Sequence, residues 1–153
     1  MAARRSCRAA GRGSAGTARG LAAAGLRVDP DLMLEGDFGY ESGFAAASRL
    51  LALPEPPTAV FAANDQMAMG VYEAVRRRGL RVPEDVSIVG FDDLPAAQWT
   101  SPPLTTVHQP LAEMGMVAAR TLLRLVRGEP VESPRLELAT ELVVRDSTAP
   151  PPA

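Results

Sequence analysis

The segment TAVFAANDQMAMG, Thr58–Gly70, joins an apolar run to a helical pattern through two short polar residues. The continuous run over 58–63 is typical of a parallel β-strand that is covered on both faces. The residues that follow repeat apolar side chains at helical spacing, so the segment predicts a strand that leads directly into a helix. Asn64 and Asp65 stand at this junction, where they either cap the helix or bind a ligand.

The same order of strand and helix recurs along the rest of the chain. Apolar and β-branched runs predict strands at 32–35, 86–91 and 104–107, and a last strand or strand pair within 136–144. Helical periodicity predicts helices over 40–53, 65–79 and 110–127, and the end of another helix before Gly25. Alternation of this kind requires a parallel sheet with crossover helices. We therefore expect an α/β fold, an open parallel sheet with helices on both faces.

The composition favours a soluble globular protein. Apolar residues make up 46% of the 153 residues and charged residues 22%. Charged residues or prolines interrupt every apolar run before it reaches the roughly 20 residues of a membrane span, so we expect no membrane association. Cys7 is the single cysteine, which fits a reducing cytoplasm.

Charge is distributed unevenly between the two parts of the chain. Residues 1–28 contain six arginines and no acid, whereas residues 29–153 contain 10 arginines and 18 acids, a net charge of −8. An acidic body argues against direct binding of nucleic acid. We interpret 1–17 as a disordered or non-native basic leader, with a phosphate-contacting arm as the alternative. The body would span 18–148, and 149–153 would be a disordered tail.

Polar residues gather where the predicted strands end. Asn64-Asp65 and Asp92-Asp93 directly follow apolar strands, and the other strand ends carry Glu35, Asp37, Phe38, His108 and Gln109. In open α/β sheets the carboxyl ends of the strands form the edge that binds ligands. The positions therefore predict a ligand site at one edge of one sheet.

Each of these residues also has a purely structural interpretation. For Asp65 and Asp93 we favour a cap or turn, whereas Asn64 fits a cap and a ligand contact equally well. Asp92 comes first after its strand, and we favour ligand contact there. Phe38, taken alone, is more typical of a core residue, and the lone His108 is more typical of a packed or hydrogen-bonded histidine than of a base or metal ligand.

The residues present exclude several kinds of chemistry. One histidine and one cysteine far apart do not make a zinc site, and no segment matches a calcium loop. The nucleophile elbow and the Gly-rich phosphate loops are absent from the sequence. We expect no metal, no cofactor and no enzymatic activity. Short acids and amides beside an aromatic ring suit the hydroxyls and ring face of a carbohydrate.

Three segments resemble one family closely. They are PTAVFAANDQMAMGVYEAVRRRGLRVPEDVSIVGFDDLPAAQWTSPPLTTVHQP (57–110), EGDFGYESGF (35–44) and ELVVRDST (141–148). Their combined motifs resemble the effector-binding core of LacI/GalR-type bacterial transcriptional regulators over about residues 20–148. The resemblance implies a periplasmic-binding-protein-like fold, of which this chain would contain mostly the carboxyl-terminal subdomain, with a sugar or nucleoside-like effector in the cleft between two subdomains.

The resemblance also implies roles for individual residues. Asn64 and Asp92 match positions that hydrogen-bond the hydroxyls of the effector, and Phe38 matches the aromatic position that packs on its ring. Gln109 matches a residue beside the cleft that transmits the allosteric switch. Met69 and the segment around Trp99 match positions in the homodimer interface.

The family's pattern is present here only in part. Its members begin with a helix-turn-helix and the amino-terminal subdomain, and neither is recognisable in this sequence, so operator DNA would be bound only through a head domain outside this chain. The expected function is that of a truncated effector-sensing domain of a cytoplasmic repressor. The alternative is a fragment of a periplasmic sugar-binding protein of a transport system, and an enzyme using Asp92 is the least favoured reading.

Overall fold

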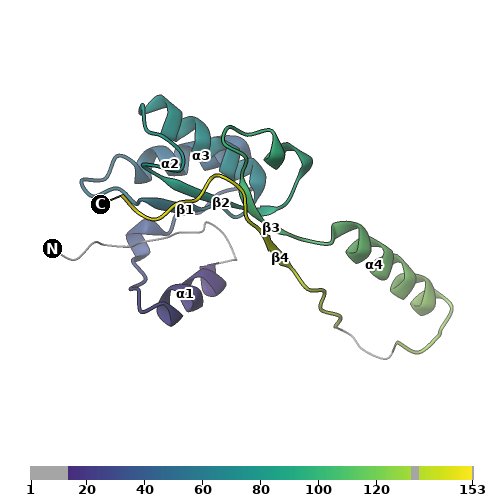
Figure 1. Ribbon diagram of the computed structural model, residues 1–153. Helices are drawn as coiled ribbons and strands as arrows, with labels where there is room; N and C mark the ends of the chain where they lie inside the picture. The colour runs from purple at the N-terminus through teal and green to yellow at the C-terminus, as the bar shows by residue number, and fades with distance from the viewer. Residues whose placement is uncertain (1–13, 132–134, 153) are drawn as a thin grey trace.

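The computed structural model describes residues 14–131 and 135–152, so Cys7 and residues 1–13 lie outside the described part. Its elements follow one another in the order α1 Ser14–Ala23, η1 Pro30–Leu32, α2 Tyr40–Leu50, β1 Ala59–Phe61, α3 Asp65–Arg77, β2 Ser87–Asp92, η2 Pro95–Gln98, β3 Thr105–His108, α4 Leu111–Val126 and β4 Glu141–Val143. Figure 1 shows α2 and α3 beside the sheet, and α4 well apart from it.

The strands form one open sheet in the order β1-β2-β3-β4. β1, β2 and β3 run parallel, with Val89 opposite Thr105, whereas β4 pairs antiparallel with β3. The predicted α/β class is confirmed, but β4 makes the sheet mixed rather than parallel. After α4 the chain comes back towards the sheet and runs alongside β3 in the opposite direction, so β4 pairs antiparallel with it.

The strand predicted at 32–35 is wrong. Pro30 starts a 3-10 helix, the side chain of Asp29 accepts a bond from the Asp31 amide, and the turn ends at Leu32. Proline at the first helical position and an Asx-type cap favour a turn over an extended strand. The following residues join no strand of the described sheet.

The core lies between the sheet and the helix pair α2–α3. Gly43 of α2 and Gly70 of α3 are both buried, and a Cβ atom at either would collide with the backbone of the other helix. Along β2, Ile88 is fully buried whereas Val89 is only partly buried. This alternation shows that one face of the sheet carries the tightly packed core, where the apolar run had predicted two covered faces.

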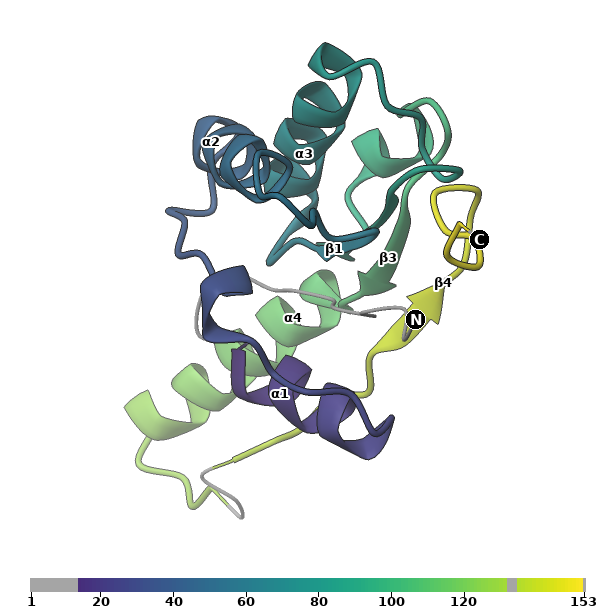
Figure 2. The ribbon, with the colours of Figure 1, turned by 90° about the vertical axis from the view of Figure 1, so that its left-hand side faces the viewer.

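α4 stands outside this core. None of its residues is buried, and its exposed large apolar side chains are Leu111, Met114, Met116, Leu122, Leu123, Leu125 and Val126. Both ribbon views place it beyond the end of the sheet, reached by the segment after β3 and left by the segment before β4 (Figures 1 and 2). We call residues 109–140, which connect β3 to β4, the α4 arm.

The segment after β4 is part of the core rather than a frayed end. Ser147 is fully buried, where its hydroxyl donates to the Ile88 carbonyl oxygen (2.6 Å) and accepts from the Thr105 amide (2.8 Å). Ala149, predicted to begin a disordered tail, donates its amide to Ser87 Oγ (3.0 Å). At the other end α1 begins at Ser14, inside the predicted leader 1–17, so helix replaces leader over the last residues of that segment.

Candidate functional site

Asn64 ends the β1–α3 connection and uses both atoms of its side-chain amide. Its Oδ1 accepts from the Met67 amide (2.8 Å), which makes Asn64 the N-cap of α3. Its Nδ2 donates to the carbonyl oxygen of Phe38 (2.9 Å). The capping role that the sequence assigned to Asp65 therefore belongs to Asn64, whose extended backbone suits a cap.

Asp65 is instead a buried link between α3 and the strands beside it. It is 0% exposed, with Oδ1 accepting from Thr106 Oγ1 (2.6 Å) and Oδ2 accepting from the Leu94 amide (2.7 Å). Burial raises the pKa of Asp65, and the bonds from Thr106 and Leu94 oppose that shift. Gly90 leaves the space for this carboxylate, because a Cβ atom there would overlap Asp65 Oδ1.

Asp92 lies at the end of β2, next to the first residue after β3. Gln109 Nε2 donates to Asp92 Oδ1 (2.6 Å), so the two residues that the sequence singled out at adjacent strands are in direct contact. Asp92 adopts φ +113°, a left-handed conformation that is unfavourable for any residue with a side chain. Surrounding contacts must therefore hold this residue in place.

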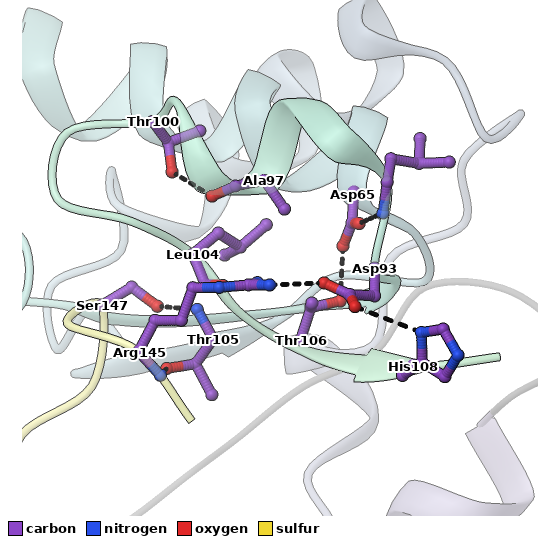
Figure 3. Close-up of polar contacts among 11 residues, drawn as sticks. Asp65, Asp93, Ala97, Thr100, Leu104, Thr105, Thr106, His108, Arg145 and Ser147 are labelled. Atoms are coloured by element: carbon purple, nitrogen blue, oxygen red, sulfur yellow. Dashed lines mark hydrogen bonds and ion pairs between the residues drawn. The ribbon is translucent and has the colours of Figure 1, made fainter. Parts of the chain in front are cut away.

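Asp93 also has a left-handed backbone, at φ +57°, and forms an ion-paired cluster. Its Oδ1 accepts from Arg145 Nη2 (2.6 Å), and its Oδ2 lies 3.1 Å from His108 Nδ1 (Figure 3). Partial burial is the largest single influence and opposes ionisation, but Arg145 and His108 together lower the pKa of Asp93. The turn expected at Asp93 is thus present in its backbone, but the carboxylate binds Arg145 and His108 rather than capping a helix. His108 is exposed and hydrogen-bonded rather than packed in the core.

Phe38 lies at the same edge but outside the core. Its side chain is 53% exposed, which contradicts the structural interpretation of this residue as a core aromatic. Its backbone carbonyl oxygen accepts the bond from Asn64, which fixes the backbone of Phe38 beside the carboxyl end of β1. Of the other acids predicted here, Glu35 is exposed, and Asp37 accepts from the Gly39 amide (2.9 Å).

The two predicted interface residues lie away from this edge. Met69 is half-buried and lines a surface groove of about 530 Å³ together with Tyr40, Tyr72 and Pro102. Trp99 follows η2 and is 80% exposed. A groove lined by both apolar and charged side chains, close to an exposed tryptophan, is a surface suited to another protein.

The sequence analysis did not identify Arg145 or Thr106 as part of this site, and it did not predict that Asp65 is buried. Arg145 lies 52 residues from Asp93, and Thr106 lies 41 residues from Asp65. No local pattern signals such pairs. Across residues 14–131 and 135–152, no three His, Cys, Asp or Glu side chains gather as a metal ion would require. Within that same part of the chain, no helix is long and apolar enough to cross a membrane.

Comparisons with known proteins give a consistent result. The profile of the periplasmic binding protein-like domain matches residues 2–148. The HTH-type transcriptional repressor CytR of Escherichia coli (strain K12) is 44% identical over 133 residues, covering 87% of this chain and 39% of that protein. The chain thus spans about two fifths of the length of this curated relative.

Solved structures match almost the entire chain. The complex of the transcriptional regulator CelR with cellobiose superimposes with a TM-score of 0.87 at 40% identity, covering 94% of this chain and 46% of that one. The lac repressor dimer bound to operator and the anti-inducer ONPF gives a TM-score of 0.83 at 34% identity, covering 95% and 52%.

Proposed function

This chain belongs to the periplasmic binding protein-like domain family of LacI-type regulators, and on that basis we propose that it senses a sugar-type effector for a bacterial transcriptional repressor. The observation that carries the proposal is that two bonded pairs, Asn64 with Phe38 and Gln109 with Asp92, lie at the carboxyl ends of neighbouring parallel strands. Residues 18–148 would form the effector-binding core.

The chemistry of these side chains suits a polyhydroxylated ligand. A carboxylate such as Asp92 accepts from hydroxyls, an amide such as Asn64 both donates and accepts, and the exposed ring of Phe38 offers an apolar face. The structural neighbour CelR was solved with cellobiose, which supports a sugar as the class of effector. We assign Asn64 and Asp92 to the effector hydroxyls and Phe38 to its ring.

Gln109 would connect effector binding to the α4 arm. It binds Asp92 and lies at the start of the arm, so a ligand that competes for the Asp92 carboxylate changes the contact at the arm's base. In the complete regulator such a change would select one of two arrangements of the protein and so alter the binding of operator DNA through a separate head domain.

We assign the groove that contains Met69, with the neighbouring Trp99, to a homodimer interface. The lac repressor neighbour is a dimer, and an exposed tryptophan close to a groove of apolar and charged side chains is typical of a contact surface. Sedimentation velocity tests this assignment. Met69→Glu should shift the chain from dimer to monomer, whereas a chain that sediments identically with and without the substitution would refute it.

A role in gene control is better supported than the two alternatives. The relatives reported above are transcriptional regulators, which favours a cytoplasmic sensor over a periplasmic transport protein. Repressors of this kind are not enzymes, and the carboxylates at the edge are engaged with amide, hydroxyl and guanidinium groups rather than with a nucleophile.

Saturation-transfer NMR with cellobiose and glucose as probes tests the effector proposal, because it detects binding as weak as millimolar. We expect transfer to at least one sugar, lost in Asn64→Ala and in Asp92→Ala. Asp85→Ala is the matched control, since Asp85 pairs with Arg81 on another part of the surface. Equal transfer in both site variants and the control would refute the site.

A further inference from the structure

Two residues that follow neighbouring strands each bind one of two adjacent aspartates. Gln109, at the start of the α4 arm, donates to Asp92 (2.6 Å). Arg145, two residues beyond the end of β4, donates to Asp93 (2.6 Å). The turn at Asp92 and Asp93 is thus bound both by the start of the arm and by the segment after β4, and only the Gln109 link has a role in the function proposed above.

Arg145 is fixed at three points, so it is able to act as a rigid support. Its Nη1 donates to the Leu104 carbonyl oxygen (2.7 Å), and its backbone amide donates to Thr105 Oγ1 (2.9 Å). Its side chain is only 15% exposed. Figure 3 shows the guanidinium between Leu104 and Asp93, with His108 on the opposite side of the Asp93 carboxylate. The planar fork of arginine is suited to binding two acceptors at once.

The turn that Arg145 supports does not form readily by itself. Asp92 and Asp93 both have left-handed φ values, +113° and +57°, and such residues persist where neighbouring groups hold them. The Leu94 amide, next in the chain, is bound by Asp65 (2.7 Å). Asp65 therefore holds one side of the turn and Arg145 the other.

We propose that Arg145 is a positioning residue: by binding Asp93 it keeps the turn in the conformation in which Asp92 meets Gln109, and so couples the segment after β4 to the effector-binding edge. The coupling to an effector rests on the proposed function, but the positioning of Asp92 does not. The test below uses no ligand, so its failure is distinguishable from a failure of the effector proposal.

The experiment is NMR of the ¹⁵N-labelled 153-residue chain, observing the Gln109 side-chain amide and hydrogen exchange at Leu94. Arg145→Met should move the Gln109 resonances towards the positions of a free amide and speed Leu94 exchange at least tenfold. Exchange of the Val75 amide in α3 should stay unchanged, because a positioning role leaves the core intact. Arg81→Met, which removes the exposed ion pair with Asp85, should alter neither signal.

Two further variants separate positioning from general stability. Arg145→Lys keeps the charge but not the fork, so it should restore the Gln109 and Leu94 signals only in part. Asp93→Gly removes the acceptor of the Arg145 bond but leaves the bonds from Arg145 to Leu104 and Thr105 available, and glycine tolerates the left-handed region, so it should shift Gln109 without unfolding the chain. If Arg145→Met unfolds, this variant decides. An unshifted Gln109 amide in the folded variants would overturn the proposal.

Discussion

Asn64 fills the capping role that the sequence offered for it, and its side chain makes a second bond that the sequence did not indicate. Its oxygen caps α3 and its nitrogen binds the backbone beside Phe38, so the residue fixes the geometry of the edge before any ligand arrives. The sequence placed Asn64 and Asp65 at the start of a helix but could not show which of them caps it. This depends on Thr106 and Leu94, which approach Asp65 from other strands and loops.

Asn64→Ala should lower the free energy of unfolding by about 1 kcal/mol, because the Met67 amide loses its partner. Asn64→Asp keeps the capping oxygen and removes only the donor to Phe38, so it should lower that free energy by less. Urea denaturation measures both, with Gln66→Ala as the control at an exposed position in the same helical turn. An equal loss in Asn64→Asp and Asn64→Ala would show that the cap is not the source.

The ion pair of Asp93 predicts how stability depends on pH. The folded pKa of Asp93 lies below its ordinary value of 3.8, so the folded chain binds fewer protons there than the unfolded chain. Its stabilising contribution is therefore complete above that ordinary value and is lost as the pH falls towards the lower, folded pKa. Arg145→Met should raise the Asp93 pKa and flatten this dependence.

Urea denaturation at a series of pH values from about 3 to about 5, roughly one unit on either side of the ordinary carboxyl pKa, measures that slope. The unaltered chain should lose stability more steeply below pH 4 than Arg145→Met does. Identical slopes would mean that Arg145 does not influence the ionisation of Asp93.

Sequence periodicity predicted the positions of most helices and strands, because these depend on neighbouring residues in the chain. The helix predicted over 65–79 is α3 at Asp65–Arg77, and the strand predicted over 104–107 is β3 at Thr105–His108. The direction of β4 could not be predicted, because antiparallel pairing depends on the path of the arm rather than on the pattern of β4 itself. The role of Arg145 could not be predicted either, because its partners Leu104 and Asp93 are distant in the sequence.

The crossing of α2 and α3 gives a prediction about the packing of these elements. Gly70→Ala should lower the free energy of unfolding by about 1–3 kcal/mol or more, because the added methyl group meets the backbone of Tyr40 and Phe44. Gly115 of α4 has open space around it, so Gly115→Ala should stabilise the helix by about 0.5–1 kcal/mol. Thermal unfolding followed by circular dichroism compares the two, and a Gly70→Ala chain as stable as the unaltered one would disprove the close crossing.

The molecule as a whole combines a packed core with an α4 arm whose large apolar side chains are mostly exposed. The core contains the sheet with α2 and α3, whereas α4 exposes Leu122 (61%) and Leu125 (57%). An exposed apolar helix favours contact with other surfaces, so the chain in this conformation should self-associate as its concentration rises. This association would be separate from the dimer proposed through Met69, because the two surfaces involve different elements.

The last prediction follows from that separation. The double variant Leu122→Glu, Leu125→Glu should reduce light scattering at high concentration, because two charges interrupt the apolar surface of α4. Its free energy of unfolding should change by less than about 0.5 kcal/mol, since neither side chain packs in the core. Leu104→Ala, at a fully buried position, should instead lose about 2–5 kcal/mol and leave the α4 surface unchanged. If the α4 variant lost as much stability as Leu104→Ala, the arm would have to pack against the core in solution, and its exposed apolar face would no longer account for the association.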